Sequence, residues 1–134
     1  MNRSEPISRE LDAVATAIVD AAFRVHSTLG PGLLESVYET CLEHELVKRG
    51  QPVLRQVSLP INYDGSKLDA GLRLDLLVAD SIIVEVKAIE RLLPVHDAQL
   101  LTYLKLARKP LGFLINFNVT LIKEGIRRRI SASP

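Results

Sequence analysis

The chain has 134 residues, of which 47% are hydrophobic and 25% are charged. This composition predicts a single folded domain over residues 8–130 with frayed termini at residues 1–7 and 131–134, and it excludes disorder across the bulk of the chain. Seventeen Lys and Arg against sixteen Asp and Glu give a formal net charge of +1, which excludes a uniformly basic nucleic-acid binder and an acidic tail. A local basic patch stays open, because net charge averages over all faces.

The single cysteine, Cys41, excludes an intramolecular disulfide and any metal or iron–sulfur site that needs four cysteines from one chain. The first residues show no apolar run of the kind that a signal peptide carries. No stretch approaches the roughly 18 apolar residues that a membrane-spanning helix needs. We therefore expect a cytoplasmic protein without a membrane partner.

Two amphipathic helices are expected at the start of the chain. Apolar residues recur at helical spacing from about Ser8 to Thr28, and Gly30-Pro31-Gly32 follows as a stop signal. A second apolar stripe runs from Leu34 to Leu46 and is expected to end near Gly50.

The apolar period then changes to the alternation that is typical of strands. Strands are expected over residues 53–61, 68–78, 82–88 and 111–117. Asp64-Gly65 and Asp80-Ser81 are turn signals, and Pro94 opens a third helix between the last two strands. Residues 119–130 remain ambiguous between a short helix and an edge strand. The order α-α-β-β-β-α-β predicts an α+β fold, with a mainly antiparallel sheet flanked by helices.

The strand over residues 82–88 places charge beside an apolar face. Because strand side chains alternate, Ile82, Val84, Val86 and Ala88 share one face, and Glu85 and Lys87 share the other with Ile83. In the preceding strand, the same alternation groups Leu72, Leu74, Leu76 and Val78 and sets Asp75 on the opposite face with Arg73 and Leu77.

Whether Asp75 meets Glu85 depends on the turn between the two strands. A two-residue loop at Asp80-Ser81 pairs Asp75 with Val86 and turns its side chain toward the core, whereas a three-residue loop from Ala79 to Ser81 pairs Asp75 with Glu85. A β-bulge near Asp75 has the same effect as the longer loop. We predict one of these two arrangements; a regular two-residue hairpin would defeat the metal-site hypothesis.

Two neighbouring carboxylates suit a hard divalent cation such as Mg²⁺ or Mn²⁺, and the backbone carbonyl of Val86 is a further candidate ligand. Such a metal polarises a phosphodiester and activates water, while Lys87 orients the water or stabilises negative charge. The simpler interpretation is a surface ion pair, worth about 0–1 kcal/mol.

Three residues on the expected helices are further candidates. Glu35 lies on the side of its helix that carries Tyr38, so it is either a third acidic ligand or a first-turn carboxylate stabilised by the helix dipole. Gln99 and Tyr103 are four residues apart and share a helix face. They reach either the metal site and a substrate phosphate, or merely a half-exposed polar edge.

Basic residues gather near the end of the chain, where Lys123 and Arg127-Arg128-Arg129 are candidate phosphate contacts or ordinary solvated charges. The three histidines, His26, His44 and His96, have no mutual metal-ligand spacing. No glycine-rich phosphate loop is present.

Five stretches, taken together and in order, resemble the GxxExxY family of the PD-(D/E)XK nuclease superfamily. They are Gly32-x-x-Glu35-x-x-Tyr38, Arg73-Leu74-Asp75-Leu76, Val84-Glu85-Val86-Lys87-Ala88, His96-Asp97-Ala98-Gln99-Leu100-Leu101-Thr102-Tyr103-Leu104 and Leu114-Ile115-Asn116-Phe117. The resemblance implies a restriction-endonuclease-like αβββαβ core after one extra N-terminal helix. It also implies a Mg²⁺ site at Glu35, Asp75, Glu85 and Lys87, with Gln99 and Tyr103 as the Gln-x-x-x-Tyr pair of RecB-like nucleases. Leu74 replaces the usual Pro before Asp75, and the cysteines of an iron–sulfur cluster are absent.

The sequence therefore predicts a metal-dependent nuclease that hydrolyses phosphodiester bonds of DNA, in repair, processing or defence, with RNA as an open alternative substrate. A homodimer is expected if both strands are cut. Two rival interpretations stay open: a non-catalytic nucleic-acid-binding or assembly module that retains the nuclease core, and a hydrolase of small nucleotides.

Overall fold

The computed structural model describes residues 8–131. Its helices are α1 (Arg9–Leu29), α2 (Glu35–Lys48), α3 (Pro94–Ala107) and the short 3₁₀ helix η1 (Ile122–Gly125). Its strands are β1 (Val53–Ser58), β2 (Ile61–Tyr63), β3 (Ser66–Leu68), β4 (Arg73–Val78), β5 (Ile82–Lys87), β6 (Leu111–Asn116) and β7 (Ile126–Ile130).

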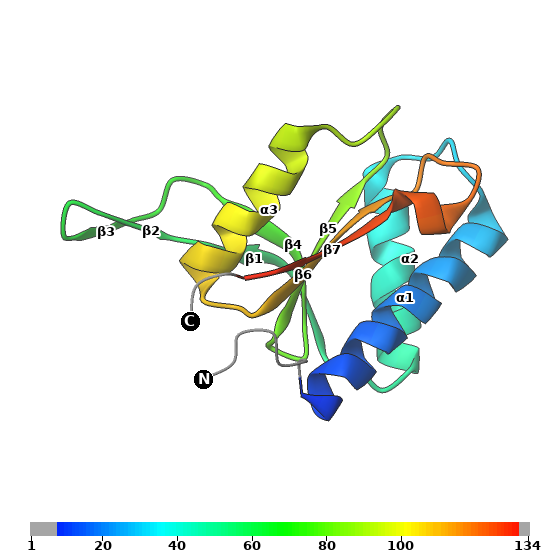
Figure 1. The fold of residues 1–134 in the computed structure, drawn as a ribbon, viewed down its shortest axis with the longest axis horizontal. Coiled ribbons are helices and arrows are strands. Elements are labelled where there is room, and N and C mark those ends of the chain that lie inside the picture. Colours follow the sequence, from blue (N-terminus) through cyan, green and yellow to red (C-terminus); the bar gives the residue numbers. More distant parts are fainter. Residues whose placement is uncertain (1–7, 132–134) are drawn as a thin grey trace.

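Five strands form the central sheet, in the order β1-β4-β5-β6-β7. β5 and β6 are parallel, and every other neighbouring pair is antiparallel. α3 makes the crossover that a parallel pair requires. In Figure 1, α1 and α2 lie on one face of the sheet and α3 lies on the other, and each face has its own buried apolar cluster. The predicted α+β fold with a mixed, mainly antiparallel sheet is confirmed.

The turn between α1 and α2 fixes where the second helix begins. Gly30 ends α1 with φ 71°, a left-handed conformation that glycine adopts easily, and its amide donates to the His26 carbonyl. The buried Tyr38 hydroxyl donates to the Gly30 carbonyl at 2.6 Å and accepts from the Leu33 amide at 3.1 Å. Its ring stacks on Phe117 at 4.6 Å between centroids. The start of α2 is thereby tied to the end of β6.

The expected strands over residues 53–61 and 68–78 are shorter than the sequence suggests. β1 ends at Ser58, because Pro60 has no N–H to continue a ladder. The intervening segment forms a separate hairpin, β2–β3, around Asp64 and Gly65, and this hairpin projects from the body of the fold (Figure 1).

Residues 119–130, left ambiguous by their pattern, form η1 and then the edge strand β7. Of the termini expected to fray, residues 1–7 and 132–134 lie outside the described residues. Ser131 is described, and its amide donates to the Pro110 carbonyl at 2.9 Å.

The prediction that Leu72, Leu74, Leu76 and Val78 share one face is wrong. Leu76 and Val78 join the core under α1 and α2, whereas Leu74, with the partly buried Leu72, joins the core under α3. The β1–β4 register passes from Arg55 opposite Leu76 to Val57 opposite Leu74 without a pair between them. Both strands change faces at this break.

Candidate functional site

The loop of the β4–β5 hairpin has an odd number of residues, as the pairing of the two carboxylates requires. The register pairs Leu76 with Val84 and Val78 with Ile82, which leaves a three-residue loop, Ala79 to Ser81. Ala79 and Asp80 have φ values of 51° and 53°, and the Ser81 amide closes the turn on the Val78 carbonyl. The prediction of an odd loop is confirmed, and extending the register by one residue sets Asp75 opposite Glu85.

At this level the two strands exchange hydrogen bonds through side chains. The Asp75 amide donates to Glu85 Oε2 at 3.0 Å, and the Val86 amide donates to Asp75 Oδ2 at 2.8 Å. Each carboxylate is therefore anchored to the backbone of the opposite strand. The two side chains therefore lie together in a fixed orientation.

Burial and neighbouring negative charge disfavour the ionised form of both carboxylates. Glu85 is only 4% exposed, and burial together with the neighbouring Asp75 carboxylate raises the pKa of Glu85 to about 8. Burial is also the main reason why the pKa of Asp75 is raised. A divalent cation would supply the charge that two such carboxylates lack, so the donor set fits a hard metal ion.

The donors that the structure brings together do not make a complete cage. Within residues 8–131, no three His, Cys, Asp or Glu side chains gather in a way that could hold a metal ion. The contact that Val86 makes here is the hydrogen bond from its backbone amide to Asp75 Oδ2. A ligand role for its carbonyl therefore stays a prediction. Any cation here would need further ligands besides Asp75 and Glu85.

Glu35 and Lys87 lie at the carboxyl end of β5. Glu35 is the first residue of α2 and is exposed, and its Oε2 accepts a long hydrogen bond, 3.4 Å, from the Ala88 amide. Lys87 is half-buried, and its positive charge lowers the pKa of both Asp75 and Glu85, against the larger effect of burial. Both side chains therefore border the pair, and no ion pair within 4.0 Å involves either of them in the described part of the chain.

α3 brings a hydroxyl toward the same pair. Gln99 Nε2 donates to the Tyr103 hydroxyl at 3.1 Å, as their helical spacing predicts. Burial, and then the negative charges of Glu85 and Asp75, raise the pKa of Tyr103. α3 approaches the sheet closely at Gly112, where a Cβ would lie 2.8 Å from Leu100 Cδ1.

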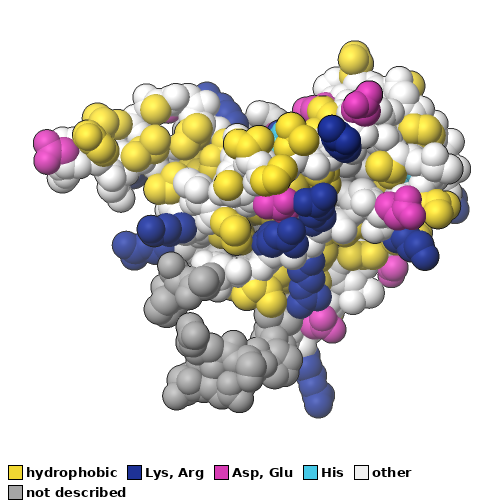
Figure 2. Space-filling view, turned by 45° about the horizontal axis from the view of Figure 1, so that its top comes forward, with side chains coloured by type: hydrophobic (Ala, Val, Ile, Leu, Met, Phe, Trp, Pro, Cys, Tyr) yellow, Lys and Arg dark blue, Asp and Glu magenta, His cyan; other side chains and the backbone are white. Residues whose placement is uncertain are grey.

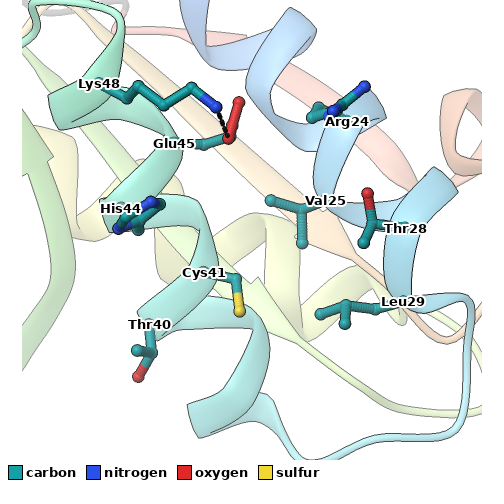
Figure 3. Close-up of a pocket in the computed structure, with 9 residues that line it drawn as sticks. All are labelled: Arg24, Val25, Thr28, Leu29, Thr40, Cys41, His44, Glu45 and Lys48. Carbon is teal, nitrogen blue, oxygen red and sulfur yellow. Dashed lines mark ion pairs between the residues drawn. The ribbon is translucent and has the colours of Figure 1, made fainter.

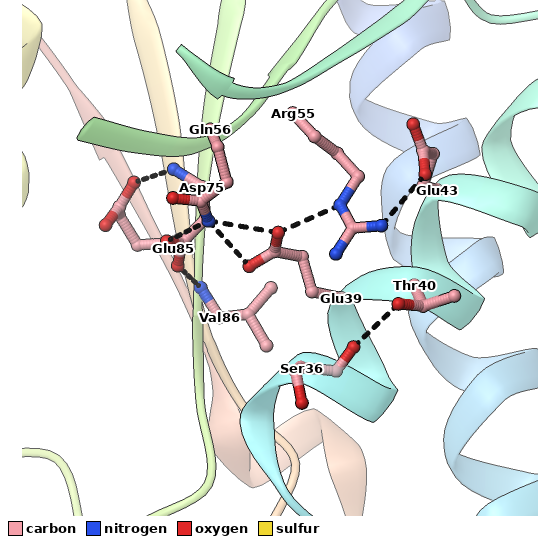
Figure 4. Close-up of polar contacts among 9 residues, drawn as sticks. All are labelled: Ser36, Glu39, Thr40, Glu43, Arg55, Gln56, Asp75, Glu85 and Val86. Carbon is pink, nitrogen blue, oxygen red and sulfur yellow. Dashed lines mark hydrogen bonds and ion pairs between the residues drawn. The ribbon is translucent and has the colours of Figure 1, made fainter. Parts of the chain in front are cut away.

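The structure adds three polar residues that sequence reasoning missed (Figure 4). Glu39 of α2 is buried, at 6% exposure, and accepts from Arg55 Nε at 2.9 Å. Gln56 Nε2 donates to the Glu39 oxygens at 3.1 and 3.0 Å and to Asp75 Oδ1 at 3.4 Å. Glu39 follows Glu35 by one helical turn, a spacing that could have drawn attention to it.

The three consecutive arginines do not form one patch. Arg127 and Arg129 of β7 both form ion pairs with Asp97 of α3. Arg128 points to the other face, where it lines a pocket with Asp12 and Asp20 of α1. Figure 2 shows basic side chains interspersed with acidic and hydrophobic ones on the face in view. Phosphate contacts by Arg127, Arg128, Arg129 and the exposed Lys123 stay predictions.

Other polar side chains have structural roles or lie elsewhere. His26 Nε2 donates to the Val119 carbonyl at 2.7 Å, and His96 Nδ1 accepts from the Leu93 amide at the start of α3. A pocket of about 440 Å³ between α1 and α2 includes Cys41 and His44 in its lining (Figure 3), and it shares no residue with the carboxylate site.

The comparisons identify the family. No helix within residues 8–131 has the length and apolar character needed to cross a membrane. No curated protein and no solved structure gives a significant match. The family model of the PD-(D/E)XK nuclease superfamily matches residues 12–129, a span that includes the hairpin, both carboxylates and α3. The chain therefore belongs to the PD-(D/E)XK nuclease superfamily.

Proposed function

We propose that this protein is a metal-dependent nuclease that hydrolyses phosphodiester bonds of DNA, with RNA as the alternative substrate. The observation that carries the proposal is the pairing of Asp75 and Glu85 across the β4–β5 hairpin, each anchored to the opposite strand, with Lys87 two residues further along β5. Membership in the nuclease superfamily supports the same chemistry.

Asp75 and Glu85 are the proposed principal ligands of Mg²⁺ or Mn²⁺, with Glu35 and the Val86 carbonyl as further donors. The bound metal would polarise the phosphodiester and lower the pKa of a water molecule. The Lys87 ammonium orients the attacking water and stabilises the negative charge that develops on the phosphoryl oxygens. The attacking water gives up a proton as its oxygen bonds to phosphorus, the bond to the leaving oxygen breaks, and the leaving oxygen takes up a proton in return.

The residues of α3 and β7 complete the proposed substrate site. Gln99 and Tyr103 donate hydrogen bonds to a phosphate beside the scissile bond. Lys123 and Arg128 contact the nucleic-acid backbone. Arg127 and Arg129 can contact it only if they break their ion pairs with Asp97 or bind a phosphate as well as Asp97. A domain of this size has little surface for reading bases, so we propose recognition of nucleic-acid structure, and a homodimer where two strands are cut.

One observation favours the second candidate function, a non-catalytic nucleic-acid-binding or assembly module. Among residues 8–131, Asp75, Glu85 and their neighbours do not form a group of three acidic, histidine or cysteine side chains that could hold a metal ion. Membership in the GxxExxY branch, the cytoplasmic location and roles in repair, processing or defence remain parts of the proposal.

The test is cleavage of single-stranded, duplex and branched DNA, and of RNA, with Mg²⁺ or Mn²⁺, by the wild type, Glu85→Ala and Lys87→Ala. The expected result is metal-dependent cleavage by the wild type and loss of cleavage in both variants. Absence of cleavage on every substrate, or equal cleavage by the variants, would overturn the proposal. Binding of nucleic acid without cleavage would support the non-catalytic module.

A further inference from the structure

β1 contains a strained residue where a strand would otherwise be regular. Gln56 has φ 53°, in the left-handed region that non-glycine residues avoid unless their surroundings hold them there. It lies between Arg55 and Val57, at the break in the β1–β4 register. Asp75, the residue that the register would place opposite Gln56, is one of the two paired carboxylates.

Three acceptor contacts hold the Gln56 side chain. Its amide nitrogen lies 3.1 and 3.0 Å from the two Glu39 oxygens and 3.4 Å from Asp75 Oδ1. Figure 4 shows the Gln56 amide between the Glu39 and Asp75 carboxylates. A strand residue with an ordinary φ would direct its side chain differently, so the unusual backbone and the side-chain contacts belong together.

Glu39 is buried, yet it is well compensated. Arg55 Nε donates to it at 2.9 Å, and the same guanidinium reaches Glu43 Oε1 at 3.3 Å. A buried carboxylate with these donors is held firmly, because a charge removed from water needs partners. Glu39 is therefore a fixed point of α2 against which Gln56 can orient Asp75.

We propose that Glu39 and Gln56 are positioning residues that hold the Asp75 carboxylate against the Val86 amide, with Arg55 balancing the charge of Glu39. The inference rests on the proposed function, since it assigns these residues to the support of a metal ligand. Gln56 orients one oxygen, Oδ1, while the Val86 amide fixes the other, Oδ2. Neither Glu39 nor Gln56 is itself assigned as a ligand.

The test uses Gln56→Gly and Glu39→Gln in the full chain. Glycine tolerates the left-handed backbone and removes the whole side chain, including the amide that contacts Glu39 and Asp75. Two matched controls separate strain and charge from position: Asp64→Gly changes another residue at φ 53°, in the β2–β3 turn, and Glu43→Gln removes the other carboxylate bound to Arg55. Thermal melts establish that each variant folds.

The first readout needs no metal. Hydrogen exchange at the Asp75 and Val86 amides reports the two bonds between the paired strands, and we expect it to rise about tenfold or more in both test variants but in neither control. The second readout is Mn²⁺ affinity, measured from the electron paramagnetic resonance signal of free Mn²⁺. We expect it to fall about 10- to 100-fold in the test variants.

Unchanged exchange at both amides in Gln56→Gly and Glu39→Gln would overturn the inference. So would equal exchange increases in the controls, which would indicate a general loss of stability. If the wild type binds no Mn²⁺ but the two amides respond as expected, the proposed function fails and the positioning role stands.

Discussion

The carboxylates of β4 and β5 and the arginines of β7 both lie on strands, and side-chain alternation affects the two sets in opposite ways. Asp75 and Glu85 are ten positions apart, yet a three-residue loop sets them together. Arg127, Arg128 and Arg129 are consecutive, so neighbouring arginines turn to opposite faces of the sheet. Which side chains meet on a sheet depends on the strand register and on whether the loop has an odd or even number of residues. Closeness in the sequence does not by itself bring side chains together.

The two regions also differ in burial. Glu85 is buried, and burial together with the Asp75 carboxylate raises its pKa to about 8, a perturbation that is typical of a ligand site. The arginines that face α3 are paired with Asp97, which is typical of a structural contact. We therefore expect substitutions at the first region to abolish function and those at the second to change stability or binding modestly.

The largest effect is expected from Glu85→Gln. The substitution keeps the shape of the side chain and removes its charge, so metal-dependent cleavage should fall by a factor on the order of 10³ or more while the fold persists. Single-turnover cleavage with Mg²⁺ and circular dichroism measure the two quantities. Cleavage within about threefold of wild type would make the pair irrelevant to catalysis.

Deleting Ser81 tests the parity of the hairpin itself. If the shortened hairpin keeps a three-residue loop by taking in Ile82, Asp75 pairs with Val86 and the β5 side chains turn to the wrong faces. We then expect a large loss of stability, about 2 kcal/mol or more, and no cleavage. Urea unfolding gives the free energy. Replacement of Ser81 by Gly, which keeps the loop length, should leave cleavage unchanged; equal damage in both variants would speak against parity as the cause.

The pH dependence of stability sharpens the electrostatic side of the comparison. A carboxyl whose pKa is raised in the fold contributes fully below its unfolded value and loses that contribution as the pH rises through the folded value. For Glu85 this window runs from 4.5 to about 8, so the metal-free protein should be less stable at pH 8 than at pH 5. The expected contribution of Glu85 is on the order of 3 to 5 kcal/mol.

Glu85→Gln is the control for that measurement, because glutamine does not titrate. Its free energy of unfolding should change less between pH 5 and pH 8 than that of the wild type, measured in urea with a chelator present. A variant with the same pH slope as the wild type would remove Glu85 as the source. Asp75, whose pKa shifts in the same direction, accounts for part of any slope that remains.

The smallest effects are expected on β7. Arg127→Ala breaks an ion pair between a half-exposed arginine and the more buried Asp97, and should cost about 0.5–1 kcal/mol of stability. Arg128→Ala has no such partner on α3 and should leave stability unchanged while weakening DNA binding and lowering its salt dependence. Thermal melts and titrations at two salt concentrations separate these outcomes, and a reversed pattern would contradict the assignment.

Much of the fold follows from local rules that the sequence displays. Ser8 caps α1 and Gly30 ends it, and Pro94 begins α3. The odd loop of the hairpin keeps Leu76 and Val78 in the same core as Ile82 and Val84. These features depend on neighbours in the chain or on a single pairing. They are therefore readable without knowledge of the packing.

The features that were missed depend on tertiary contacts. Nothing in the sequence marks Gln56 for a left-handed conformation, because glutamine has no preference for it and its contacts come from α2 and β4. The change of face at Leu74 follows from the break in the β1–β4 register at Gln56. The role of Glu39 depends on Arg55, sixteen residues away, and only the folded chain sets the two together.

The most direct test of the central claim is titration of the wild type and Asp75→Asn with Mn²⁺ at pH 8, followed by the signal of free Mn²⁺. The account predicts that the wild type binds Mn²⁺ at a site that the variant lacks. Failure of the wild type to bind, or equal binding by the folded Asp75→Asn variant, would contradict the claim that Asp75 and Glu85 form a metal site.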